Sequence, residues 1–155
     1  MAHKSFKIIL SIEICVVSLM NQENIIKVFV YGTLKPRGKY YKIFCEGKTI
    51  EEQECWTKGS LFALPVGYPA MIEGNDQVYG YVLSFASFKD LENLDKLEGY
   101  SGIPNSPLNE YDRAKIIVYN QANQAIDEVW SYFMTEEKVK TLNGVYLPSG
   151  MWHQE

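Results

Sequence analysis

Short apolar runs separated by turn residues constrain the fold of this 155-residue chain most strongly. These runs are rich in β-branched and aromatic residues, have the length of strands, and are mostly too close together for βαβ crossovers. They cover residues 25–31, 56–64, 78–85, 114–119 and 128–134. We therefore predict an α+β fold: a small mixed, strongly curved or barrel-like β-sheet with a few short helices.

The helices are expected between the strands and near the end of the chain. Residues 40–46 and 136–142 fit short helices, and residues 87–98 carry the clearest helical periodicity. A long loop with two prolines follows over residues 100–110. The chain has no repeat and no low-complexity linker, so a single domain over residues 20–155 is expected.

Residues 1–19 look different from the rest. The apolar run Ile8–Leu19 follows two lysines and imitates a signal peptide, but Glu13 interrupts it and it is too short to span a bilayer. We interpret residues 1–19 as an N-terminal extension, with Met20 as an alternative start. An added strand or helix is the second interpretation, and an export signal the third.

The overall charge points to a small-molecule partner. A net charge of −4, a pI near 5.3 and the lack of a Lys/Arg cluster argue against a nucleic-acid-binding surface, and no segment fits a membrane span. Cys15, Cys45 and Cys55 have no CxxC spacing and indicate reduced thiols of a cytoplasmic protein. We expect no disulfide framework, no metal site and no cofactor.

Histidine usage limits the possible chemistry. The two histidines, His3 and His153, lie near the ends of the chain, which disfavours nucleophile–histidine sites and histidine-based metal sites. Neither a GxxxxGK[ST] phosphate loop nor a GxGxxG turn is present. A carboxylate, a tyrosine or a lysine remains as the group for proton transfer.

Glu98 is the carboxylate that stands out. Ser87 is a good N-cap and Gly99 a good helix stop, and between them one face of the helix is apolar. That face contains Phe88, Leu91, Leu94 and Leu97. Glu98 falls on it, so burial and the negative end of the helix dipole should raise its pKa, as in a general acid or base. Alternatively, its side chain turns to solvent or pairs with Arg113.

A second candidate element is Tyr31-Gly32-Thr33-Leu34 at the end of the first strand. The glycine allows a sharp turn that leaves N–H groups free to hold a carboxylate or an oxyanion, although an ordinary turn is the simpler interpretation. Tyr111 and Arg113 alternate along a later strand and therefore share a face. They either reach the site or anchor the strand.

These motifs together resemble the gamma-glutamylcyclotransferase-like family, including its gamma-glutamylamine cyclotransferase branch. The resemblance runs from Val28 to Trp152 and uses five elements in order. These are Val28–Lys35, Gly67-Tyr68-Pro69-Ala70, Gly80-Tyr81-Val82, Leu94–Tyr100 and Tyr111-Asp112-Arg113. The resemblance implies the small mixed barrel of that family, with Glu98 as catalytic acid/base, Tyr31–Leu34 as cradle for the glutamyl group, and Tyr111 and Arg113 beside the substrate.

The implied activity is a cyclotransferase reaction. A γ-glutamyl amino acid, peptide or amine would be converted into 5-oxoproline and a free amine, with the leaving group left open. The segment Ser101–Asn109 looks longer than in compact members of the family and would act as a lid that changes the substrate. The alternatives are a non-catalytic small-molecule binding module of the same fold and a hydrolase that uses Cys45 or Cys55.

Overall fold

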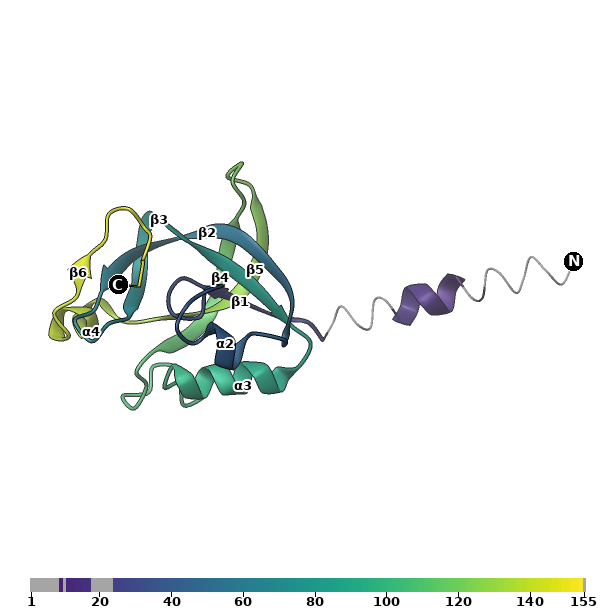
Figure 1. Cartoon of the computed structure of the whole chain (residues 1–155), viewed down its shortest axis with the longest axis horizontal. Helices are drawn as coiled ribbons and strands as arrows, with labels where there is room; N and C mark the ends of the chain where they lie inside the picture. The colour runs from purple at the N-terminus through teal and green to yellow at the C-terminus, as the bar shows by residue number, and fades with distance from the viewer. Residues whose placement is uncertain (1–8, 10, 18–23, 155) are drawn as a thin grey trace, which may run out of the picture.

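The computed structural model describes residues 9, 11–17 and 24–154 (Figure 1). The elements of the domain are β1 (Ile26–Val30), α2 (Tyr41–Phe44), β2 (Thr49–Ala63), β3 (Pro69–Phe85), α3 (Phe88–Leu97), β4 (Asp112–Tyr119), β5 (Ala125–Phe133), α4 (Glu136–Thr141) and β6 (Val145–Tyr146). All five predicted strands and all three predicted helices are present. The predicted α+β class, a mixed sheet with a few short helices, is confirmed.

Most of the expected N-terminal extension lies outside the described residues. Residues 9 and 11–17 are helical and their side chains are exposed. The interpretation of residues 1–19 as an extension stays a prediction. Among the described residues, no helix is both long enough and apolar enough to cross a membrane.

The strands form one sheet in the order β3-β1-β5-β4-β2-β6. All neighbours are antiparallel except β1 and β5, which run parallel. β2 also pairs with β3, so the pairings β3–β1–β5–β4–β2 return to the strand from which they start. This ring of pairings gives the strong curvature visible in Figure 1, where α3 lies along one side of the strands.

β2 and β3 are longer than the sequence pattern predicts. β2 begins at Thr49 rather than Trp56, with an exposed polar stretch that pairs along β3. β3 begins at Pro69 rather than Val78 and includes the turn-like residues Glu73–Asp76. The pairing there jumps from Gly59↔Asp76 to Ser60↔Ile72, so a bulge accommodates these residues without ending the strand.

β1 is buried on both faces and separates two hydrophobic clusters. Val28 and Val30 point into the first cluster, whereas Phe29 and the following Tyr31 point into the second. The second cluster takes side chains from each of the strands β1 to β5 and therefore fills the interior of the ring. A continuous apolar run is what a strand with two covered faces requires.

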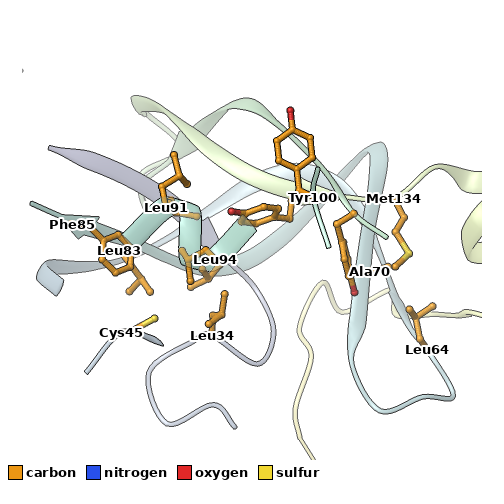
Figure 2. Close-up of a cluster of buried hydrophobic side chains, with 14 of the residues drawn as sticks. Leu34, Cys45, Leu64, Ala70, Leu83, Phe85, Leu91, Leu94, Tyr100 and Met134 are labelled. Atoms are coloured by element: carbon orange, nitrogen blue, oxygen red, sulfur yellow. The ribbon is translucent and has the colours of Figure 1, made fainter. Parts of the chain in front are cut away.

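The first cluster lies under α3 and receives its two fully buried residues, Leu91 and Leu94 (Figure 2). Leu97 is partly buried, as the helical face predicts. Phe88 is 58% exposed, so its placement on the buried face was wrong. Phe88 is the first residue of the helix and packs against neither cluster. With 3.6 residues per turn it stands about 120° around the helix axis from Leu94, so it lies at the edge of the apolar face rather than on its buried centre.

Candidate functional site

A cavity of about 140 Å³ opens where the end of β1 meets the end of α3. This volume is small beside the 300–1,000 Å³ or so that is usual for ligand pockets, so it suits a ligand of few atoms. Its walls are formed by Phe29, Val30, Tyr31, Gly32, Thr33, Leu34, Tyr40, Tyr68, Pro69, Leu97, Glu98, Glu110, Tyr111 and Tyr132. Glu98, Tyr31–Leu34 and Tyr111, all selected from the sequence, therefore line one cavity.

The loop after β1 presents its backbone to this cavity. A Cβ on Gly32 would lie 2.7 Å from the ring of Pro69, so only glycine allows this close approach. Leu34 is buried in the first cluster and anchors the loop. Within the described residues, the N–H groups of Gly32, Thr33 and Leu34 donate no hydrogen bond, which leaves them available to an anionic group.

The end of α3 sets the position of Glu98. Glu98 is the C-cap residue and Gly99 follows in the left-handed conformation (φ +64°). The N–H of Tyr100 bonds to the carbonyl of Asp95 at 2.8 Å, and the N–H of Gly99 bonds to the carbonyl of Lys96 at 3.3 Å. This is a Schellman motif, which ends the helix at a defined residue.

Two further backbone bonds join Glu98 to the opposite wall. The Glu98 carbonyl accepts a hydrogen bond from the N–H of Tyr111 at 3.1 Å, and the Gly99 carbonyl accepts one from the N–H of Glu110 at 3.0 Å. The cap and these bonds hold the main chain on both sides of Glu98. The backbone position from which the Glu98 side chain extends is therefore fixed by hydrogen bonds.

The carboxyl group of Glu98 is itself unpaired. Across the ranges that the structure describes, it forms no ion pair and no side-chain hydrogen bond. Burial raises its pKa to about 8, and the neighbouring carboxylate of Glu110 contributes to the same shift. A group with this pKa can both accept and return a proton near neutral pH.

Two buried tyrosines form walls of the cavity, with their hydroxyl groups directed at backbone carbonyls. The hydroxyl of Tyr31 donates to the carbonyl of Tyr132 and that of Tyr111 donates to the carbonyl of Pro69, each at 2.7 Å. Burial raises the pKa of both groups. Because their protons are already engaged, these tyrosines shape the cavity rather than exchange protons with a ligand.

Arg113 is the predicted site residue that the structure does not bring to the cavity. Its guanidinium forms a 2.7 Å ion pair with Asp95 and lies over the rings of Tyr100 and Trp130. Tyr111 and Arg113 do alternate along the strand, but the guanidinium of Arg113 lies against α3 and does not line the cavity. It anchors the strand to the helix, which was one of its two interpretations.

Several lining residues were missed in the sequence. Glu110, Tyr68, Tyr40 and Tyr132 all face the cavity, and the hydroxyl of Tyr68 donates a hydrogen bond to Glu110. Tyr68 stands in the turn motif Gly67–Ala70, and Glu110 directly precedes the Tyr-x-Arg triplet. That adjacency was the available signal, but Tyr68 and Glu110 are 42 positions apart in the chain, so no local sequence pattern reveals the pair.

The buried cysteines lack the properties of nucleophiles. Cys45 and Cys55 are both free thiols in the hydrophobic clusters and line no part of the cavity. Burial raises the pKa of Cys45 to about 12 and that of Cys55 to about 11. Since the thiolate is the reactive form, neither residue supports a cysteine hydrolase.

The sequence model of one protein family, described as gamma-glutamyl cyclotransferase, AIG2-like, matches residues 28–154. No match is found among curated proteins.

Solved structures with the same fold come from several kingdoms. YkqA from Bacillus subtilis is 24% identical with a TM-score of 0.58, over 83% of this chain and 39% of YkqA, so the chain spans about two fifths of that relative. A protein of Arabidopsis thaliana is 26% identical with a TM-score of 0.54, over 71% of this chain and 68% of its own. An AIG2-like protein from Mus musculus is 18% identical with a TM-score of 0.55, over 72% of this chain and 78% of its own.

Proposed function

The chain belongs to the gamma-glutamyl cyclotransferase, AIG2-like family, and we propose that it converts a γ-glutamyl compound into 5-oxoproline and a free amine. The observation that carries this proposal is the meeting of an unpaired carboxyl group, Glu98, with the free N–H groups of the Tyr31–Leu34 loop in one small cavity.

Binding is assigned to the loop. The N–H groups of Gly32, Thr33 and Leu34 hold the α-carboxylate of the γ-glutamyl group, because no lysine, arginine or histidine is among the residues described as lining the cavity. The walls around this point include Tyr31 and Tyr111 and keep the glutamyl chain folded. In this conformer the α-nitrogen lies next to the γ-carbonyl carbon, and orientation of this kind lowers the barrier by several kcal/mol.

Glu98 then carries protons from the attacking nitrogen to the leaving nitrogen. Its carboxylate takes a proton from the α-ammonium group, and the freed amine attacks the γ-carbonyl carbon to close the five-membered lactam. The bond from that carbon to the leaving nitrogen breaks as Glu98 returns the proton to this nitrogen. The second proton of the attacking nitrogen then passes to the Glu98 carboxylate and on to the released amine, which leaves as an ammonium ion. The substrate is thus divided into 5-oxoproline and an amine, with no water consumed and no covalent enzyme intermediate.

The pKa of Glu98 suits both steps. A value of about 8 makes the carboxylate a better base than an exposed glutamate, and the protonated form a competent acid. The entry of a substrate ammonium group favours the ionised carboxylate. Glu98 therefore becomes a base when the substrate is bound.

The deciding experiment is an assay of γ-glutamyl compounds for release of 5-oxoproline. The panel covers γ-glutamyl-alanine, γ-glutamyl-alaninamide, γ-glutamyl-ethylamine, Nε-(γ-glutamyl)-lysine and glutathione. We expect release from at least one of them, and loss of that release in Glu98→Gln. Binding without release from any compound would favour the non-catalytic binding module.

A further inference from the structure

Glu110 places a second carboxylate at the mouth of the cavity. The residue is exposed yet lines the cavity, and the Tyr68 hydroxyl donates a hydrogen bond to its side chain. Its backbone is held by the Gly99 carbonyl, and its Cβ lies 2.9 Å from the position that a Cβ on Gly99 would take. The Glu110 side chain is therefore fixed from both ends, close to Glu98.

No cation neutralises Glu110 in the part of the chain that the structure describes. Lys138 is close, but its ammonium group donates to the backbone carbonyls of Asn109 and Glu110. The ammonium group of Lys39 lies 5.3 Å from the centre of the ring of Tyr40, which lines the cavity. The carboxylate of Glu110 therefore has no ion-pair partner among these residues, although the ammonium group of Lys138 lies close to the Glu110 backbone.

The proposed reaction places the leaving group at this rim. The cavity is small, so the glutamyl group occupies it and the leaving group extends toward the opening. The leaving nitrogen must be near Glu98, which returns its proton. The negative charge of Glu110 raises the pKa of Glu98, so the two carboxyl groups interact electrostatically. A charged group one or two bonds beyond the leaving nitrogen, which lies near Glu98, would therefore also interact with the charge of Glu110.

We propose that Glu110, held by Tyr68, is a specificity-determining residue that selects against leaving groups with a carboxylate beside the scissile nitrogen. Like charges close together at a partly desolvated rim are costly, whereas a neutral or cationic leaving group avoids this cost. This inference rests on the proposed function. It narrows the substrate to γ-glutamyl compounds whose leaving amine lacks a neighbouring anionic group.

The test compares two substrates that differ in one charge. γ-Glutamyl-alanine and γ-glutamyl-alaninamide have nearly the same shape, but only the first has a carboxylate beside the scissile nitrogen. We expect the wild type to show a kcat/KM at least about threefold higher for the alaninamide compound. Glu110→Gln keeps a hydrogen-bond acceptor for Tyr68 and should bring this ratio close to one.

Two controls separate the charge at the rim from other effects. Glu92→Gln removes an exposed carboxylate from α3 that does not line the cavity, and should leave the substrate ratio unchanged. Added salt should reduce the wild-type ratio, since exposed charges are screened. If Glu110→Gln also alters the properties of Glu98, the kcat/KM values of both substrates change by the same factor, and the ratio between them does not change.

A wild-type preference for γ-glutamyl-alanine would overturn the inference. An unchanged ratio in Glu110→Gln would do so as well. If the wild type releases 5-oxoproline from neither compound, the ratio of their dissociation constants, measured by calorimetry, replaces the kinetic ratio. A charge-dependent ratio of dissociation constants without turnover would support Glu110 while contradicting the proposed cyclotransferase activity.

Discussion

Asp95 and Glu98 lie three residues apart at the end of α3, and their surroundings differ completely. Asp95 accepts hydrogen bonds from Arg113 at 2.7 Å and from the hydroxyl of Tyr132 at 2.6 Å. Glu98 has no such partner among the described residues and faces the cavity. One carboxylate is neutralised by the fold, and the other is left free for a ligand.

The difference explains why a carboxylate on a packed helix can be structural at one position and a candidate for catalysis at the next turn. The ion pair with Arg113 holds Asp95 in place and occupies its carboxylate. Glu98 lacks a cation and is partly buried beside Glu110, so its pKa rises to about 8. Four predictions, made with three substitutions, test this difference between Asp95 and Glu98, from the largest expected effect to the smallest.

Glu98→Gln should lower 5-oxoproline release by about 10²- to 10⁴-fold, the usual loss for an acid–base group. Binding of 5-oxoproline should change much less, because the loop N–H groups assigned to its carboxylate are unaffected. Initial rates and calorimetric titration measure the two effects. Glu92→Gln is the matched control, and undiminished turnover in Glu98→Gln would contradict the mechanism.

Arg113→Leu should destabilise the protein by about 3 kcal/mol, because it leaves Asp95 unpaired and largely buried. The free energy of unfolding in urea measures this loss. The matched control is Lys140→Ala, which breaks an exposed ion pair with Glu136 and should cost less than about 0.5 kcal/mol. Equal effects of the two substitutions would show that Asp95 is as well solvated as Glu136.

The stability of Glu98→Gln should exceed that of the wild type by a margin that grows with pH. The pKa of Glu98 rises from its ordinary 4.5 to about 8 on folding, so between these values the folded protein binds more protons than the unfolded chain. Wild-type stability therefore falls as pH rises through this window, and glutamine cannot titrate. Urea unfolding at pH 5 and pH 8.5 should show a margin on the order of 2 kcal/mol larger at pH 8.5. A constant margin would mean that Glu98 titrates as an exposed residue.

Tyr132→Phe should have the smallest effect, a loss of about 1 kcal/mol of stability, because it removes one of the hydrogen bonds to Asp95 and leaves the ion pair. Turnover should change by less than about threefold, since the hydroxyl points to Asp95. Urea unfolding and initial rates measure both quantities. A loss of activity comparable to that of Glu98→Gln would make Tyr132 part of the catalytic machinery.

Several features of this protein could be predicted because neighbouring residues determine them. The apolar face that singled out Glu98 extends over a few turns of helix, and the Gly99 stop lies next to it. The turn after β1 likewise depends on Gly32 and its neighbours. Hydrophobic periodicity and glycine placement act over a few residues, so the chain alone contains this information.

Other features were decided by contacts between distant segments. Phe88 lies at the edge of the apolar helical face, and only the packing around α3 shows that its side chain stays exposed. Residues 73–76 have the composition of a turn, yet the pairing of β3 with β2 keeps them in the strand. At these positions tertiary contacts, rather than local sequence propensity, determine the structure.

The electrostatic character of the site belongs to this second group. The sequence alone determined that Glu98 would lie on an apolar helical face. Which carboxylate Arg113 would neutralise, and that Glu110 and Tyr68 would meet at the cavity mouth, only the tertiary structure decided. The physical reason is that charge pairing depends on the distance between atoms in space, and the folding of the sheet sets that distance for residues far apart in the chain.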